Sequence, residues 1–406
     1  MFGFYRTVLL AIFAIHLAFA PATLDAQTPR LVLLDGNSVS GAISAISHEG
    51  VVTVDGIDEP LELEGLRSID LAKVTSRPPN SKISVQLAGG GILHARGVTI
   101  RNEESQVTWR SDQQFTLSID ALHAIKFNAS GTDGGFDRAL NNPSPQSDRV
   151  FAEVEDDKIQ TFPGLLVELS DSEVVFMFRG KERKLPRKKV FGIVFAQVAG
   201  GAGKQLNSMV QLRDGSLIPG NLDSLVEGTL QMTLVGETAI KLPWDAIASI
   251  RIRSSRLAYL SDLNPEEEKQ APIVTIAHPW QRDRSVLGAP LTLRDKDGSE
   301  QVFRKGVGVH ARSELTFSLD SRFDEFAATI GIDAETEGRG NCEFIVIADR
   351  KRVFSQQVKG SEPLRKISVD VSGVEMLTLL VDPGADLDLA DHADWCDARL
   401  IRKSKK

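Results

Sequence analysis

The sequence predicts an all-β protein, built from tandem small β-barrel-like repeats followed by a jelly-roll β-sandwich. Short runs such as Val51–Val54 and Leu230–Leu234 alternate apolar with polar residues, which is the period of a half-buried strand. Asp-Gly pairs stand at 35–36 and 214–215, and this pair is a strong hairpin signal because glycine accepts a positive φ. No long helical pattern is evident after residue 26.

The first 26 residues have the pattern of a secretory signal peptide. Arg6 supplies the positive start, and Val8–Ala20 is an apolar run of thirteen residues, which is shorter than the ~20 residues that span a bilayer. We expect cleavage after Ala26, with an uncleaved anchor as the alternative. No later segment is apolar enough to be transmembrane. The mature chain is therefore expected to be extracytoplasmic, whether periplasmic, at the cell surface or secreted.

Chain length and charge limit the classes of function. The 406 residues exceed the roughly 250–300 at which a single core stops growing, so we expect several domains. The net charge is −8, whereas nucleic-acid binding requires clustered Lys and Arg. We therefore expect no nucleic-acid partner. The one basic run, residues 179–189, is either a patch for polyanions or the solvated face of a hairpin.

Four internal repeats occupy residues 30–253. Each ends with three apolar residues that are spaced by five and then by three positions. These triplets are Leu61, Leu66 and Ile69; Leu117, Leu122 and Ile125; Leu185, Val190 and Ile193; and Leu242, Ile247 and Ile250. Units with four or five short strands look like small curled barrels of Sm-like shape. Because such units are marginal alone, we expect them to pair, with two in 30–127, two in 150–253 and an irregular linker between.

The region 257–403 has the pattern of a separate β-sandwich. Alternating segments recur at roughly ten-residue intervals, at Glu314–Leu319, Phe326–Ile330, Glu343–Ile347, Ile367–Val371 and Met376–Val381. Short strands with this spacing favour a jelly roll. Glycines 306, 308 and 331 lie inside strand-like runs, where glycine usually marks a bulge or a close approach of backbone.

Two phrases in this region carry a family resemblance. They are Lys305–Ser313 (KGVGVHARS) and Asp391–Leu400 (DHADWCDARL), with Ile330–Asp333 (IGID) between them. In this order they resemble the NPCBM family, a carbohydrate-binding module found on glycosidases and bacterial surface proteins. The resemblance covers about residues 257–402. It implies a β-sandwich that binds sugars, and it does not say which residues touch the ligand.

Sugar recognition needs a flat apolar surface and a few fixed polar groups. The candidate carbohydrate-binding residues are Trp280, His310, Arg312, Asp333, Asp394 and Trp395. Structural alternatives stay open for four of them. Trp395 fits a core residue of the last strand, His310 fits a hydrogen bond to a neighbouring strand, Trp280 fits a cover over the sandwich edge, and Asp333 fits a turn cap.

The acidic stretch from Asp382 to Asp397 raises the question of a cation. Dense aspartates can supply the oxygen ligands that Ca²⁺ prefers, and similar sandwich modules often hold a structural calcium. We expect Asp397 and Asp391 to be its ligands, with a solvated acidic loop as the alternative. Cys342 and Cys396 form a disulfide if their strands are neighbours, and otherwise act as small buried apolar groups.

No catalytic constellation assembles. The sequence contains no GxSxG, P-loop or HExxH motif, so we do not expect an enzyme. The residues predict an exported, non-catalytic protein that binds polysaccharide or glycan through its C-terminal sandwich. The alternatives are a structural or protein-interaction protein with a partner in the cell envelope, and an accessory subunit of a glycoside hydrolase.

Overall fold

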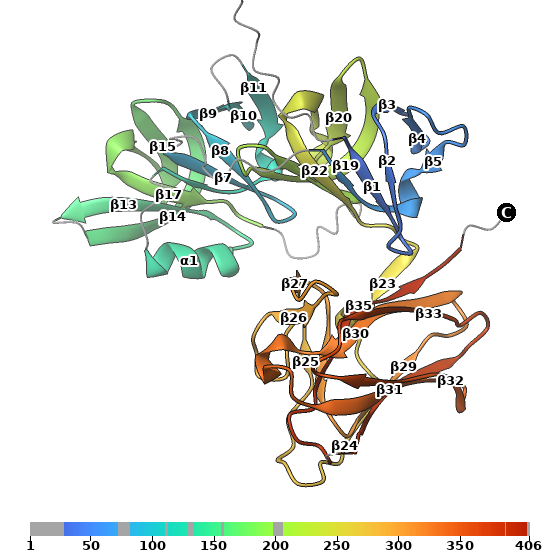
Figure 1. Ribbon diagram of the computed structural model, residues 1–406. Helices are drawn as coiled ribbons and strands as arrows, with labels where there is room; N and C mark the ends of the chain where they lie inside the picture. Colours follow the sequence, from blue (N-terminus) through green and yellow to red (C-terminus); the bar gives the residue numbers. More distant parts are fainter. Residues whose placement is uncertain are drawn as a thin grey trace, which may run out of the picture.

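The computed structural model (Figure 1) shows an all-β molecule in two parts, the repeats and the sandwich. The predicted signal peptide lies outside the described residues. The structure describes residues 28–71, 82–109, 113–127, 133–155, 158–197, 206–385 and 387–403.

Each repeat is a bent antiparallel sheet of five segments. We number the repeats units 1 to 4. Unit 3 contains β13 (Asp148–Glu155), β14 (Lys158–Leu169), β15 (Glu173–Phe178), β16 (Lys181–Pro186) and β17 (Val190–Val194), and unit 4 contains β18 (Ser208–Leu212), β19 (Leu217–Val226), β20 (Thr229–Thr233), β21 (Ala239–Pro243) and β22 (Ile247–Ile252). In both units the first four strands form a meander and the fifth returns to pair with the first.

Units 1 and 2 follow the same plan, with the long second strand divided into two. Unit 1 contains β1 (Arg30–Leu33), β2 (Ser38–Ser40), β3 (Ile43–Ile46), β4 (Val51–Val54), β5 (Leu61–Glu62) and β6 (Leu66–Asp70). Unit 2 contains β7 (Ile83–Leu87), β8 (Gly91–Ala95), β9 (Gly97–Arg101), β10 (Glu104–Thr108), β11 (Gln114–Ser118) and β12 (Leu122–Lys126).

The spacing of the repeated triplets has a structural cause. In every unit the five-residue step contains a single 3₁₀ turn between the last two strands. These turns are Leu63–Gly65, Ile119–Ala121, Arg187–Lys189 and Trp244–Ala246. The three-residue step then runs along the fifth strand. It places the last apolar residue of each triplet at the junction between two units.

The units associate in pairs through their fifth strands, and the pairs are not formed by units that are adjacent in sequence within 30–127 or 150–253. β6 pairs with β22, where Ile69 lies opposite Ile250. β12 pairs with β17, where Ile125 lies opposite Ile193. All four isoleucines are fully buried, so unit 1 joins unit 4 and unit 2 joins unit 3 by matching positions of the repeat.

The prediction of barrels needs one correction. The strands of the four units form one network of 22 paired strands, and none of the units closes into a barrel of its own within the described ranges. The physical reason is that each fifth strand uses its outer edge to pair with another unit. One continuous apolar core also runs through all four units, because a bent sheet of this size buries too little apolar surface alone.

The linker between units 2 and 3, predicted to be irregular, contains the single α-helix of the described residues, α1 (Gly134–Asn141). Its start is capped by Asp133, whose Oδ1 accepts a hydrogen bond from the Phe136 N–H at 2.7 Å. Phe136 then packs edge-on against Phe151 and Phe191. The helix buries Phe136 and Ala139 on one face, but eight residues are only about two turns, too few for this spacing to stand out in the sequence.

The C-terminal part is a sandwich of two antiparallel sheets, as predicted. The first sheet has the order β25-β28-β35-β30-β33 with β23 beside β35, and the second has the order β24-β29-β34-β31-β32. Its strands are β23 (Leu257–Tyr259), β24 (Glu267–Gln270), β25 (Gln281–Arg282), β28 (Gly306–His310), β29 (Ser313–Ser318), β30 (Glu325–Ile332), β31 (Asn341–Ala348), β32 (Lys351–Lys359), β33 (Arg365–Asp370), β34 (Met376–Pro383) and β35 (His392–Ile401). Apart from the β31–β32 hairpin, successive strands from β28 to β35 cross from one sheet to the other, as in a jelly roll.

A hairpin, β26 (Leu291–Arg294) with β27 (Glu300–Phe303), covers the outer face of the first sheet. The close approach predicted at glycines 306, 308 and 331 is present, and a Cβ at Gly306 would lie 2.7 Å from the Trp395 carbonyl oxygen. A Cβ at Gly308 would lie 2.3 Å from the Arg284 carbonyl oxygen, and one at Gly331 would lie 2.8 Å from a Leu293 methyl carbon.

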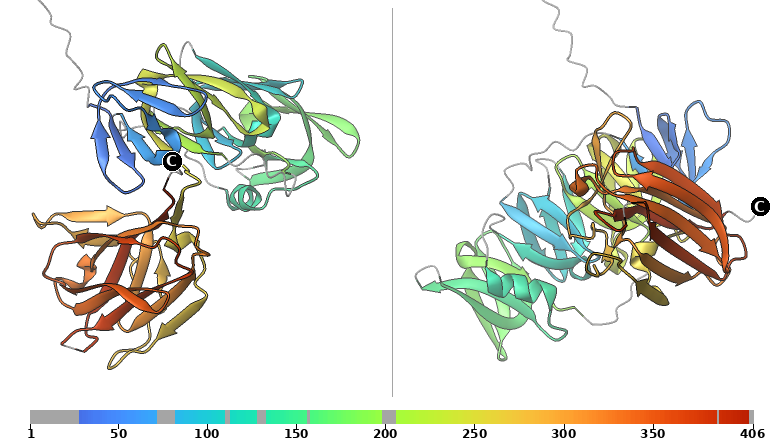
Figure 2. Two further views of the ribbon diagram at one scale, coloured as in Figure 1. Left: turned by 90° about the vertical axis from the view of Figure 1, so that its right-hand side faces the viewer. Right: turned by 60° about the horizontal axis from the view of Figure 1, so that its bottom comes forward.

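Unit 1 contacts the sandwich directly (Figure 2). The Arg67 guanidinium donates to both oxygens of Asp397, at 2.7 and 2.5 Å. Arg399 also donates to Asp397 Oδ2, and to the carbonyl oxygens of Leu34 and Asp35. No helix among the described residues is long and apolar enough to cross a membrane.

Candidate functional site

The two phrases that carry the resemblance lie side by side on the first sheet of the sandwich. β28 pairs antiparallel with β35, so that His310 faces His392 and Gly308 faces Asp394. Because side chains alternate along a strand, the intervening residues point into the core. Polar groups of both phrases therefore gather on the outer face, at the end where β28 finishes and β35 begins.

Three imidazoles meet at this end of the sheet. We call His278, His310 and His392 the histidine cluster; their ring centroids are 5.2, 5.6 and 6.3 Å apart. His310 is 5% exposed, while the side chain of His392 is 16% exposed. The cluster thus lies at the surface, with His310 as its inner member.

The hydrogen bonds determine which ring nitrogens can meet a ligand. His392 Nδ1 is 2.8 Å from Glu335 Oε1, and His310 Nδ1 is 2.6 Å from the Ala311 carbonyl oxygen. Carboxylate and carbonyl oxygens only accept, so both Nδ1 atoms donate. In each neutral imidazole Nε2 is then left as an acceptor, which suits a hydroxyl donor.

The environment of His310 favours the neutral ring. Burial lowers the pKa of His310 below its ordinary value, and the neighbouring His392 and His278 act in the same direction. At neutral pH this imidazole is therefore uncharged, and its Nε2 keeps its lone pair.

A buried carboxylate holds the segment that leads to His278. Asp388 accepts hydrogen bonds from the backbone N–H groups of Ile273, Val274 and Thr275, and from the Thr275 hydroxyl at 2.7 Å. Although burial opposes ionisation, these donors lower the pKa of Asp388 far below its ordinary range. These hydrogen bonds of Asp388 latch two loops together. The two loops carry exposed apolar side chains, namely Ile273, Val274, Ile276, Leu387 and Leu389.

Asp333 and Asp394, which were predicted to contact the ligand, are instead buried beneath the site. Asp333 is 2% exposed; it caps a 3₁₀ turn through the Glu335 N–H and accepts from the Thr292 N–H, which confirms the turn-cap alternative. Asp394 is 1% exposed. Burial, with the nearby carboxyl groups of Asp333 and Glu335, raises the pKa of Asp394 well above its ordinary value. Asp394 therefore keeps its proton to a higher pH than an exposed aspartate does.

The raised pKa has a consequence for stability. Asp394 ionises near pH ~3.9 in the unfolded chain and only at a higher pH when folded, so between these two pKa values the folded state binds more protons. Its contribution to stability therefore falls as pH rises toward its raised pKa. We expect Asp394→Asn, which copies the neutral acid, to stabilise the sandwich at pH 7 and to flatten this dependence.

Urea unfolding of the wild type and Asp394→Asn between about pH 4 and 7 measures this effect. Asp333→Asn is the control and should destabilise the sandwich, because both carboxylate oxygens accept backbone N–H groups. Loss of stability in Asp394→Asn at pH 7 would contradict a raised pKa of Asp394.

The remaining predicted sugar contacts lie elsewhere. Trp395 is 1% exposed and packs edge-on against Phe344 at 4.9 Å, so the prediction that it contacts glycan is corrected in favour of a core role. Trp280 is half-buried beside the sheet edge, and Arg282 covers one face of its ring at 4.6 Å. Arg312 is exposed and pairs with Asp382.

The predicted calcium ligands do not converge. Asp397 is held between Arg67 and Arg399, and Asp391 is buried with its Oδ1 accepting from the Asn341 N–H. Over the residues the structure describes, no group of three or more His, Cys, Asp or Glu side chains is arranged to hold a metal ion. The carboxylate of Asp397 is instead occupied by its two arginine partners.

The predicted disulfide is not formed. Cys342 lies on β31 in the second sheet and Cys396 on β35 in the first sheet, so the strands are not neighbours. Both thiols are fully buried, which matches the alternative of small apolar core groups.

Sequence reasoning missed His278, His392, Glu335 and Asp388. His392 stood inside the phrase 391–400 but was overlooked beside Asp394 and Trp395. One signal was available, because three of the seven histidines fall in the C-terminal region. Their meeting could not be read from the chain, since they come from three separate segments.

Comparison with known families identifies the domain but not the site. Residues 256–401 match the model of the NPCBM/NEW2 domain. A segment of 101 residues is 28% identical to a Renibacterium salmoninarum protein named "Putative endo-alpha-N-acetylgalactosaminidase". This match covers 25% of the present chain and only 7% of that protein.

Two solved structures are reported for their similarity to this chain. The CBM51 module of a Clostridium perfringens GH95 protein, solved with methyl-galactose, is 29% identical over 36% of this chain and 99% of its own, with a TM-score of 0.33. The tandem CBM51 modules of a family 98 glycoside hydrolase from Streptococcus pneumoniae are 16% identical over 80% of this chain and 89% of their own, with a TM-score of 0.32.

Proposed function

We propose, on the premise that residues 256–401 form an NPCBM/NEW2 domain, that this is an exported, non-catalytic protein that binds glycan at the histidine cluster. The family match carries the proposal, because NPCBM domains are carbohydrate-binding modules. Export rests on the signal-peptide pattern of residues 1–26. Recognition would attach the protein to polysaccharide at a cell surface or in its environment.

The chemistry of the cluster supports recognition of hydroxyl groups. His310 and His392 offer Nε2 acceptors, and Glu335 fixes the ring of His392 from behind. Glu335 is itself held by the Ser285 hydroxyl at 2.8 Å. The exposed apolar side chains of the two latched loops lie close by in sequence and offer surface for sugar C–H groups.

We expect His392→Ala to weaken glycan binding by about tenfold or more, because one acceptor is lost and Glu335 loses its partner. A broad glycan screen of the full chain finds the ligand, and calorimetry then measures its affinity for both proteins. Adding a chelator to the screen tests the structural calcium, which stays part of this proposal with ligands still to be found.

The matched control is His48→Ala, an exposed histidine of unit 1, which should bind like the wild type. Absence of any bound glycan, or normal affinity in His392→Ala, would rule out this site. Release of chromophore from a chromogenic glycoside by the pure protein would instead show that the protein is an enzyme.

A further inference from the structure

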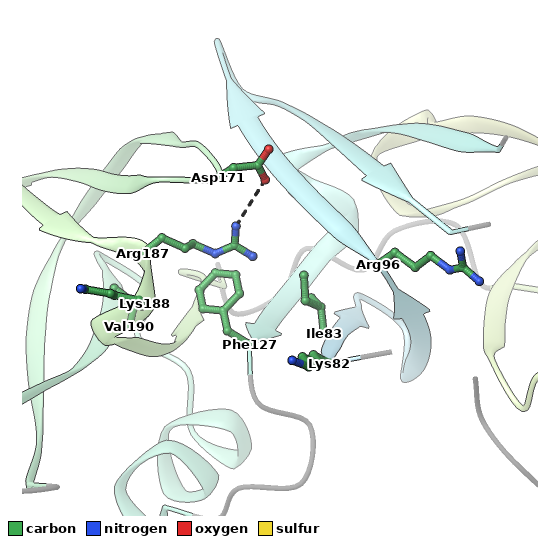
Figure 3. A pocket seen from close by; sticks show the side chains of 8 residues that line it. All are labelled: Lys82, Ile83, Arg96, Phe127, Asp171, Arg187, Lys188 and Val190. Atoms are coloured by element: carbon green, nitrogen blue, oxygen red, sulfur yellow. Dashed lines mark ion pairs between the residues drawn. The ribbon is translucent and has the colours of Figure 1, made fainter. Parts of the chain in front are cut away.

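A cavity of about 660 Å³ lies between units 2 and 3, far from the histidine cluster in sequence (Figure 3). Its apolar wall is formed by Ile83, Phe127 and Val190. The charged side chains around it are Lys82, Arg96, Arg187, Lys188 and Asp171. Four cations thus surround the cavity with a single carboxylate, in a chain whose net charge is −8.

Arg187 is the central group of this cavity. Only 13% of its side chain is exposed, and its guanidinium lies 4.0 Å above the Phe127 ring centroid, as Figure 3 shows. Nη1 donates to the Ser170 carbonyl oxygen at 3.3 Å. Nε is buried and has no hydrogen-bond partner among the described residues.

The charge of Arg187 is poorly compensated. Asp171 is 3.8 Å away and 89% exposed, so water screens this pair. Burial lowers the pKa of Arg187, and only Asp171 opposes that change; arginine nevertheless stays protonated in proteins. A desolvated cation with an unsatisfied N–H donor costs free energy unless an anion pairs with it and accepts the hydrogen bond.

The other cations enlarge the positive field. Lys82 precedes β7, Arg96 lies between β8 and β9, and Lys188 follows Arg187 in the 3₁₀ turn. All three are exposed, and Arg96 and Lys188 lie at opposite rims of the cavity in Figure 3. Long flexible side chains of this kind can close over an anion that Arg187 already holds.

We propose that this cavity binds the oxyanion of an acidic saccharide, either a uronate carboxylate or a sulfate ester. A guanidinium matches such an oxyanion with paired N–H donors, and the apolar wall suits the C–H face of a sugar ring. The volume falls within the ~300–1,000 Å³ of small-molecule sites. The oxyanion is argued from the cavity alone, whereas the saccharide as its carrier rests on the proposed glycan function.

The test is calorimetry on the full chain with four probes: a sulfated tetrasaccharide, trigalacturonic acid, a neutral trisaccharide and inorganic sulfate. We expect one of the two acidic saccharides to bind, and their relative affinity distinguishes sulfate from carboxylate. Arg187→Ala should weaken that binding by about tenfold or more. Lys188→Glu, an exposed change that leaves the fold alone, should weaken it as well.

Arg183→Ala is the matched control, because Arg183 belongs to the same basic run but is exposed on β16 and does not line the cavity. It should change the affinity less than twofold. Equal losses in Arg183→Ala and Arg187→Ala would mean diffuse attraction and would overturn the proposal, as would binding of none of the three anions. Binding of inorganic sulfate without either acidic saccharide would support the oxyanion site and overturn the saccharide as its carrier.

His392→Ala separates this proposal from the glycan site of the sandwich. It should leave acidic-saccharide binding intact, while Arg187→Ala leaves binding at the histidine cluster intact. Loss of acidic-saccharide binding in His392→Ala would place the anion at the sandwich and overturn the cavity proposal.

Discussion

Replacing Trp395 with alanine is expected to destabilise the sandwich by about 3–5 kcal/mol, which is the usual cost of removing a large aromatic side chain from a core. Trp395 is 1% exposed and contacts Phe344 and Phe326 between the two sheets. Denaturant unfolding followed by circular dichroism measures the loss. Any loss of glycan binding in this variant should follow unfolding rather than precede it.

Two further variants distinguish a core role from a ligand contact. Trp395→Phe keeps much of the packing and should cost less than Trp395→Ala, with glycan binding retained. Trp280→Ala removes a half-buried indole at the sheet edge and should cost no more than about 1 kcal/mol. A stable Trp395→Ala protein that no longer binds glycan would show that the indole reaches the ligand after all.

The position of Trp395 shows what a strand pattern can predict. Alternation along 391–400 establishes that residues 393 and 395 share one face and 392 and 394 the other. The pattern does not establish which face is covered by the second sheet and which by the β26–β27 hairpin, because both covers are apolar. Only the assembled sandwich decides that Trp395 faces the core and His392 the surface.

The repeats show a similar limit. The triplet spacing predicted strands, turns and association in pairs, since each unit has too small a core alone. It could not predict that unit 1 joins unit 4 and unit 2 joins unit 3, because the four fifth strands present nearly the same apolar residues. Partner choice depends on contacts between distant segments, such as Leu225 beside Ile46.

Asp397 is a further case in which local composition misled the interpretation. It stands in an acidic stretch that favours a calcium loop, yet its partner Arg67 is 330 residues away in sequence. Charge pairing across a domain junction leaves no local signal. Apart from their count, the histidines give no better signal, since His278 and His392 come from distant segments and meet only in the folded domain.

Asp397→Ala is therefore expected to weaken the junction between unit 1 and the sandwich by about 2–4 kcal/mol. The side chains of Arg67 and Arg399 are 19% and 6% exposed, so removing the carboxylate leaves two poorly hydrated cations facing each other. The sandwich should unfold at a lower denaturant concentration. Limited proteolysis should also cut faster near residues 253–257, which join the two parts.

A surface pair provides the comparison that decides the cause. Glu168 pairs with Arg101, which is 75% exposed, and Glu168→Ala should cost less than about 1 kcal/mol. The same measurements separate ion pairing from calcium binding at Asp397. If Asp397 held calcium, a chelator would lower the stability of the wild type and leave that of Asp397→Ala unchanged. If the arginines are its only partners, a chelator should not change the difference in stability between the two proteins.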